Sequence, residues 1–152
     1  ISGHMDEAAR LQESWDWLWK KHGVEPMIYD YKKDSIVNAE YDLNPEIFES
    51  AWYLWELTGE EHFLEMIKGY YANLLEYCST DLAFTALQDV ISKEKRDYMA
   101  SYFLAETLKY LYLAFADQDM YSLETVVFST EAHPYIKAAL DPGKVRKHLG
   151  IE

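Results

Sequence analysis

The sequence has little of several residue types, and each shortage argues against a class of protein or site. Its single cysteine, Cys78, excludes a disulfide within the chain. It has no run of 18 apolar residues, so we expect no membrane span in this chain. Its 6 glycines are scattered rather than gathered in a phosphate-binding loop, and its 5 histidines follow no HExxH spacing. These patterns argue against phosphate-loop and zinc chemistry.

Basic residues are also few. The chain of 152 residues has 14 Lys and Arg against 27 Asp and Glu, a net charge of −13. Such a surface repels phosphates, so neither nucleic acid nor an anionic membrane is expected as a partner. Hydrophobic residues, in contrast, make up 49% and aromatic residues 16%, and the length suffices for one core. The aromatic residues fit either a thick helical core or a surface that stacks on sugar rings.

Periodicity predicts a chain built mainly from helices. Apolar residues recur at helical spacing, and Gly23 and Gly59 follow the first two periodic segments, where they are expected to end the helices. Almost no linker separates the second helix from the third, which predicts an antiparallel pair. The expected helices cover residues 6–21, 45–57, 60–77 and 97–115.

Short extended segments are expected between the helices, and the tail from residue 141 is expected to form a turn and a short basic helix end. The extended segments lie at 27–31 and 36–41 within a long loop over 24–43, at 84–87 and 89–91 as a small hairpin, and at 125–130 as a strand. Helix pairs interrupted by hairpins favour an all-α fold that forms part of an α-hairpin barrel.

The run Asn44-Pro45-Glu46 has the composition of a helix start. Asn is a favoured N-cap, Pro suits the first helical position, and an early carboxylate complements the helix dipole. Glu49 follows one turn later, so both carboxylates are expected to face the same space. Two facing acids either perturb each other's pKa or share a cation, whereas from this motif alone dipole complementarity is the simpler explanation of Glu46.

Glu106 interrupts an apolar stripe on the last predicted long helix. Such a carboxylate is paired with a cation, hydrogen-bonded, or catalytic, and the sequence leaves these alternatives open. The members of the stripe, at helical spacing, are Met99, Phe103, Glu106, Tyr110 and Leu113.

A third acid, Glu131, follows the predicted strand beside Thr130 and His133. Taken alone it is read as an exposed loop acid. Separated glutamates with one threonine hydroxyl supply only oxygen donors, which suit Ca²⁺ far better than Zn²⁺.

Three of these motifs, in this order, resemble the C-terminal portion of the glycoside hydrolase family 47 α-mannosidases. The resemblance runs from about Ala9 to Tyr135. It is tightest in Asn44-Pro45-Glu46-Ile47-Phe48-Glu49-Ser50, in Ser101-Tyr102-Phe103-Leu104-Ala105-Glu106-Thr107-Leu108-Lys109-Tyr110-Leu111-Tyr112-Leu113, and in Ser129-Thr130-Glu131-Ala132-His133-Pro134.

The resemblance implies an inverting exo-α-1,2-mannosidase on an (α/α)7 barrel with a bound Ca²⁺. Glu46 would be the general base, and Thr130 would bind Ca²⁺ through its carbonyl and hydroxyl oxygens. The partner would be a mannose-containing oligosaccharide, and the location extracytoplasmic, in a eukaryotic secretory pathway or after bacterial export. The implied substrate contacts are Glu49, Glu106 and Glu131, which would hold calcium-bound waters and sugar hydroxyls, and Tyr102 or Phe103, which would pack against the mannose ring.

The chain also departs from the family pattern. Asn44 stands where the family has Arg, so a planar bidentate substrate contact is lost, and Ser129 replaces Asn. The family's general acid lies in the N-terminal portion of the barrel. We therefore expect residues 6–152 to be the C-terminal part of the barrel, which needs the remaining half. The opening residues 1–5 are expected to be a cloning scar, from their own sequence. The alternatives are a non-catalytic mannose-binding module or pseudoenzyme, and an α-helical interaction domain.

Overall fold

The computed structural model describes residues 3–116, 121–139 and 141–150. The chain divides into two compact units, Ile1–Phe115 and Ala116–Glu152. Within the described residues, no helix combines the length and apolar character needed to cross a bilayer.

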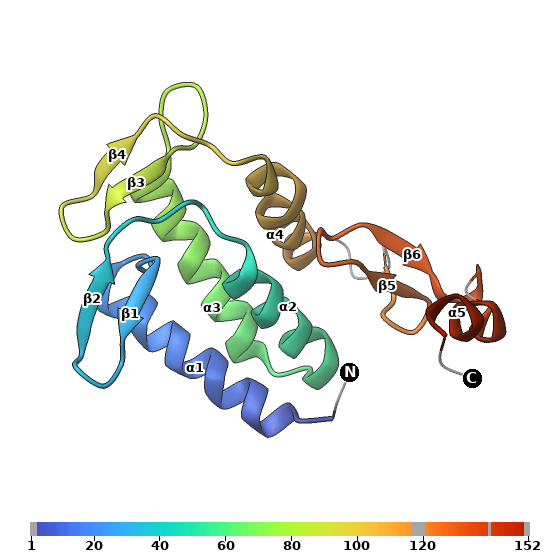
Figure 1. The fold of residues 1–152 in the computed structure, drawn as a ribbon. Coiled ribbons are helices and arrows are strands. Elements are labelled where there is room, and N and C mark those ends of the chain that lie inside the picture. Colours follow the sequence, from blue (N-terminus) through green and yellow to red (C-terminus); the bar gives the residue numbers. More distant parts are fainter. Residues whose placement is uncertain (1–2, 117–120, 140, 151–152) are drawn as a thin grey trace. The chain divides into compact units, whose positions relative to one another are not determined.

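The first unit consists of helices and two antiparallel hairpins (Figure 1). Its elements are α1 (Met5–His22), β1 (Ile28–Asp30), β2 (Ser35–Asn38), α2 (Glu46–Thr58), α3 (Glu61–Asn73) with a π-helical turn at Leu74–Cys78, β3 (Ala86–Asp89), β4 (Glu94–Arg96), a π-helical segment at Phe103–Thr107, and α4 (Leu108–Phe115).

The second unit contains an antiparallel hairpin of β5 (Val126–Phe128) and β6 (Pro134–Ile136). A 3₁₀ turn at Lys137–Ala139 and helix α5 (Pro142–Leu149) follow it. The Asp141 side chain caps α5 by accepting hydrogen bonds from the backbone N–H groups of Gly143 and Lys144. The strand and the short basic helix predicted for this part of the chain are therefore confirmed.

The helix ends predicted from glycine are confirmed. Gly23 and Gly59 both adopt left-handed φ angles, 80° and 71°, and their N–H groups bond to the carbonyl oxygens of Trp19 and Trp55. Left-handed backbone favours glycine, which has no Cβ to clash with the following carbonyl. The long loop after Gly23 contains the predicted extended pieces, which pair as β1 and β2.

Two predicted boundaries are wrong, and tertiary or turn hydrogen bonds explain both. Asp89 ends β3, and residues 90 and 91 begin the turn of the second hairpin, because the Asp89 carboxylate accepts from the N–H groups of Ile91 and Ser92. The true partner strand is β4. The helix expected from Asp97 begins only at residue 101, because the Tyr98 carbonyl accepts a hydrogen bond from Ala86 and extends the strand pairing.

The core of the first unit forms where α1, α2 and α3 lie side by side (Figure 1). Trp19 of α1 is 1% exposed and lies at its centre. Its ring packs against Tyr41, Phe48 and Tyr70, with centroid separations of 4.8 to 5.8 Å. Its indole N–H donates to Asn73 Oδ1 over 2.9 Å, which fixes the register of α1 on α3. The helix-rich fold with small hairpins predicted from the sequence is thus confirmed.

Candidate active site

Residues 40–43, which lead into α2, are held by three sets of contacts, and these contacts position Glu46. The Tyr41 backbone pairs with Leu87 through two hydrogen bonds of 2.9 and 3.0 Å. Arg96 of β4 forms ion pairs with Glu40 and Asp42. The start of α2 is therefore attached to the second hairpin rather than to a free loop.

The third attachment comes from the π-helical segment and its N-cap. The Tyr102 hydroxyl donates to the Asp42 carbonyl over 3.1 Å, and the Thr107 hydroxyl donates to the Leu43 carbonyl over 2.8 Å. Leu43 is fully buried and adopts a left-handed φ of 65°, which costs a non-glycine residue about 1–3 kcal/mol. The surrounding contacts hold this strained conformation immediately before the helix that starts with Glu46.

The predicted capping by Asn44 is wrong. Pro45 occupies the N-cap position of α2, with φ −85° and ψ −21°, and no side chain caps the helix. The Pro45 carbonyl accepts from the N–H groups of Phe48 and Glu49, so Glu46 is the first helical residue. The Asn44 side chain instead lines a pocket together with residues of α1 and of the loop that follows α1.

We expect Thr107→Val to lower the free energy of unfolding by about 1–3 kcal/mol, because it leaves the Leu43 carbonyl buried without its donor. Chemical denaturation followed by tryptophan fluorescence measures this, since all 5 Trp residues belong to the first unit. Thr58→Val is the control, because its hydroxyl bonds to Leu54 O at an exposed helix end. Equal losses in both variants would contradict the assigned tether.

The structure brings Glu49 and Glu106 to the same tyrosine. The Tyr110 hydroxyl, on α4, donates to Glu49 Oε1 over 2.9 Å. Burial raises the pKa of Glu49, the charge of Glu46 raises it further, and the Tyr110 hydrogen bond opposes them. Glu106 is 9% exposed, and its charge is among the causes that raise the pKa of Tyr110, after burial and Glu49. The acids that the sequence placed on two separate helices therefore act on one side chain.

The two aromatic candidates differ in exposure. Phe103 is fully buried and packs against Phe84, with ring centroids 5.0 Å apart. Tyr102 is partly exposed. Of the two, Tyr102 has ring surface that a ligand can reach.

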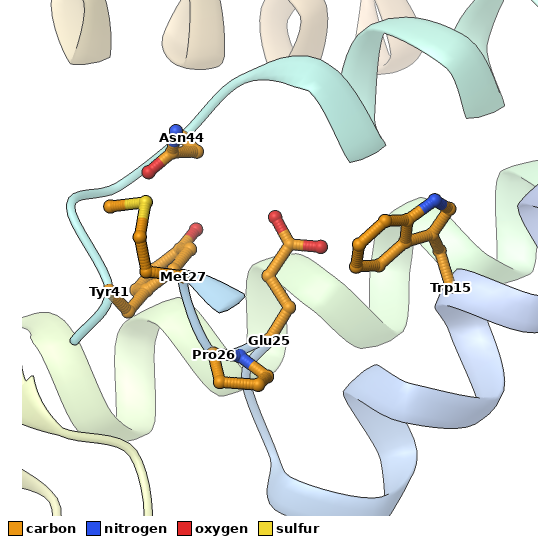
Figure 2. Close-up of a pocket in the computed structure, with 6 residues that line it drawn as sticks. All are labelled: Trp15, Glu25, Pro26, Met27, Tyr41 and Asn44. Atoms are coloured by element: carbon orange, nitrogen blue, oxygen red, sulfur yellow. The ribbon is translucent and has the colours of Figure 1, made fainter. Parts of the chain in front are cut away.

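A pocket lies beside Asn44, between α1 and the segment before α2 (Figure 2). Figure 2 shows the Glu25 carboxyl between the Trp15 ring and the Asn44 side chain. Burial raises the pKa of Glu25 to about 8, and the negative charge of Glu46 contributes to the rise. The lining residues are Trp15, Glu25, Pro26, Met27, Tyr41 and Asn44.

Sequence reasoning did not find Glu25. It lies in an irregular segment, so no helical or strand period marks it, and it belongs to none of the three motifs. A local signal does exist, because Val24 and Pro26 on either side are both buried. A carboxylate between buried neighbours in a long loop is the pattern that indicates a polar group held in an apolar place.

In the second unit, Thr130 and Glu131 occupy the tip of the β5–β6 turn, and both are exposed. The turn is closed by Ser129, whose N–H donates to the His133 carbonyl over 3.0 Å and whose hydroxyl accepts from the His133 N–H over 3.1 Å. Ala132 adopts a left-handed φ of 55° within this turn. The oxygen atoms of Thr130 are thus presented at an exposed tip.

The described residues contain no group of three or more His, Cys, Asp or Glu side chains that are placed to hold a metal ion. Thr130 is exposed, and its hydroxyl and carbonyl oxygens are hard donors of the kind that Ca²⁺ prefers. Water can supply the rest of the roughly six to eight ligands that Ca²⁺ takes.

Comparison with known proteins assigns the chain to a class of helical glycosidases. The model of the family described as Glycosyl hydrolase family 47 matches residues 2–137. The structure is similar to that of the alpha-1,2-mannosidase from Trichoderma reesei, with a TM-score of 0.72 at 24% identity over 83% of this chain and 32% of that one. This similarity supports the fold.

Two curated relatives are more similar in sequence. Mannosyl-oligosaccharide 1,2-alpha-mannosidase IC from Homo sapiens is 46% identical over 120 residues, which is 75% of this chain and 19% of the relative. Mannosyl-oligosaccharide 1,2-alpha-mannosidase mans-2 from Caenorhabditis elegans is 44% identical over 114 residues, 71% of this chain and 19% of the relative. The chain belongs to glycosyl hydrolase family 47, and it spans about a fifth of the length of these relatives.

Proposed function

We propose that this chain carries the general-base side of an inverting, calcium-dependent exo-α-1,2-mannosidase that trims mannose from oligosaccharides. The observation that supports this most strongly is the tethered position of Glu46 at the start of α2, in a chain of family 47. Glu46 is exposed, so water can reach its carboxylate. The relatives' names give the substrate class, since they act on α-1,2-linked mannose.

In this mechanism Glu46 accepts a proton from the water that attacks the anomeric carbon. An inverting enzyme separates its acid from its base by about 6.5–9.5 Å, which leaves room for that water. Glu49, which accepts a hydrogen bond from Tyr110, and Glu106, whose charge acts on the same tyrosine, would orient the sugar hydroxyls. Tyr102 would contact the mannose ring. Asn44 would contribute a single amide where the family's Arg is bidentate.

We further propose that other helix pairs of an (α/α)7 barrel supply the proton donor and cover the helices of this chain. The chain covers 32% of the solved mannosidase. Its helical segments also expose large apolar side chains, which favours a covering partner. These residues, between 49% and 60% exposed, are Leu11, Leu57, Leu104, Tyr112 and Phe115.

Calcium would be held by the carbonyl and hydroxyl of Thr130, with Glu131 holding bound water. Such a hard cation orients sugar hydroxyls and stabilises developing charge. An extracytoplasmic location is part of the proposal, because one relative is named for the ER. This relative, the human ER degradation-enhancing alpha-mannosidase-like protein 3, is 35% identical over 137 residues.

We expect Thr130→Ala to weaken calcium binding by the 152-residue chain at least about tenfold, because one direct oxygen ligand is removed. Isothermal titration with calcium chloride measures this. Thr125→Ala is the control, since Thr125 is also an exposed threonine of the second unit. A titration that does not change in Thr130→Ala would remove Thr130 from the metal site.

The stereochemical outcome tests the proposed function. The substrate is α-1,2-mannobiose, and the enzyme is a chimaera in which residues 6–137 replace the matching segment of the human relative IC. Proton NMR should show β-mannose first, because inversion of an α-linkage gives the β-anomer. α-Mannose as the first product would contradict inversion. Binding without turnover in a folded chimaera would support a non-catalytic binding module instead.

A further inference from the structure

The pocket beside Asn44 contains polar atoms that the fold leaves unsatisfied. Tyr41 is 1% exposed, and among the described residues neither its hydroxyl nor the buried Oδ1 of Asn44 has a hydrogen-bond partner. A buried polar atom without a partner costs about 1–3 kcal/mol. Two of them in one pocket leave hydrogen bonds that a bound ligand or an ordered water can supply.

Glu25 adds a third polar group to the same space. In Figure 2 its carboxyl and the Tyr41 hydroxyl both point into the pocket. A carboxyl with a pKa of about 8 keeps its proton at neutral pH, so it both donates and accepts. The pocket therefore offers a phenol donor, an amide acceptor and a carboxylic acid close together.

The remaining walls are apolar. Trp15 of α1 is 40% exposed and presents its ring beside the Glu25 carboxyl (Figure 2). Pro26 and Met27 complete the lining. A few convergent polar groups with an aromatic wall are the composition of sites that bind neutral, hydroxyl-rich rings.

We propose that this pocket binds one hydroxyl-bearing edge of a neutral sugar, with Glu25 and Tyr41 as specificity-determining residues and Trp15 packed against the ring. The choice of a mannoside as the sugar rests on the proposed function. Glu25 hydrogen-bonds a sugar hydroxyl as a neutral acid, and Asn44 Oδ1 accepts from a neighbouring hydroxyl.

The size and charge of the pocket select this ligand. Its volume is about 70 Å³, whereas pockets that enclose a whole ligand have roughly 300–1,000 Å³, so only an edge of the ring enters. An anion is disfavoured because the charge of Glu46 acts on the same space. A metal is disfavoured too, since the described residues contain no cluster of three or more metal-binding side chains.

Of the titratable side chains that line this pocket, Glu25 is the one that changes charge near pH 8. Glu46 of α2 contributes negative charge to Glu25, and Glu25 in turn acts on Tyr41 and on Tyr70 of α3. Burial raises the pKa of both tyrosines, so they stay neutral through this range. On α1, Asp16 is paired with Lys20 over 2.6 Å.

Tyr41→Phe tests the pocket without disturbing the fold, because it removes only the unpartnered hydroxyl. Methyl α-mannoside is titrated into the 152-residue chain in the presence of a chelator, so the result does not depend on calcium. The expected loss of affinity is about three- to tenfold, the value of one hydrogen bond. Unchanged affinity in Tyr41→Phe, or no mannoside binding by the wild type, would overturn the proposal.

Glu25→Gln tests the role of the proton. Wild-type affinity should fall at least about threefold between about pH 6 and about pH 9.5 as Glu25 ionises, because its donor is lost. The variant keeps an amide donor at both pH values, so its affinity should stay level. Glu13→Gln, an exposed acid of α1, should keep the wild-type profile. A pH profile that Glu25→Gln does not flatten would overturn the assignment.

These results separate the pocket from the proposed function. Mannoside binding with the expected pH profile, in a chain whose chimaera releases no mannose, would support the pocket and contradict the enzyme. Mannose release by the chimaera, together with a mannoside affinity that does not depend on Tyr41 or Glu25, would support the enzyme and overturn the proposed pocket.

Discussion

Glu46→Gln in the chimaera should lower kcat for α-1,2-mannobiose by about 10²- to 10⁴-fold, the usual contribution of a general base. The amide has nearly the same shape but cannot accept the proton of the attacking water. Glu46 is exposed at the first position of α2, so the change leaves no cavity in the core. Substrate binding should therefore stay close to that of the unmodified chimaera. Mannose release measured at saturating substrate separates the two effects.

A matched variant separates catalysis from the helix dipole. Glu61 is also an exposed acid at the first position of a helix, α3, so Glu61→Gln removes the same dipole interaction. The kcat of the chimaera with Glu61→Gln should equal that of the unmodified chimaera. If Glu46→Gln retained activity, or if both variants lost it equally, Glu46 would not be the base, and the simpler explanation by dipole complementarity would hold.

Trp19→Ala should lower the free energy of unfolding of the first unit by about 3–5 kcal/mol. The substitution empties the centre of a cluster of three aromatic rings and leaves Asn73 Oδ1 without its indole donor. Domains of this size are stable by about 5–15 kcal/mol, so the variant would be marginal. Urea denaturation followed by the fluorescence of the remaining tryptophans measures the loss.

Trp17→Ala is the control for this experiment. Trp17 lies on the same helix but is 53% exposed, and its contacts are with Tyr29 and Lys21 at the surface. Its loss should cost less than about 1 kcal/mol. Similar losses for the two tryptophans would contradict the central position of Trp19.

The parts of the fold that could be predicted from the sequence are those that local chemistry decides. Gly23 and Gly59 end their helices because their own backbone permits the left-handed turn. The position of Asn44 outside the N-cap of α2 could not be predicted from local preference, because hydrogen bonds from distant residues fix the backbone just before it. The late helix start at residue 101 has the same origin, since Tyr98 pairs with Ala86.

The candidate site also combines residues that the local sequence reveals with contacts between distant residues that it does not. Glu106 stands out in the sequence because it interrupts an apolar stripe, whereas the roles predicted for Glu46, Glu49 and Thr130 come from motifs that resemble a family. The hydrogen bond from Tyr110 to Glu49 joins residues about 60 positions apart, and helical spacing alone does not reveal it. Glu25 is even harder to predict from the sequence, because its pKa is raised mainly by burial, in a pocket lined by residues of α1 and of the segment before α2.

The proposed calcium-dependent mannosidase is tested most directly by mannose release from α-1,2-mannobiose by the chimaera with excess calcium, after chelation, and after calcium is restored. We expect release with calcium, loss with the chelator, recovery when calcium is restored, and no recovery in the Glu46→Gln chimaera. Release that persists in the chelator, or a folded chimaera that releases no mannose under any condition, would contradict it.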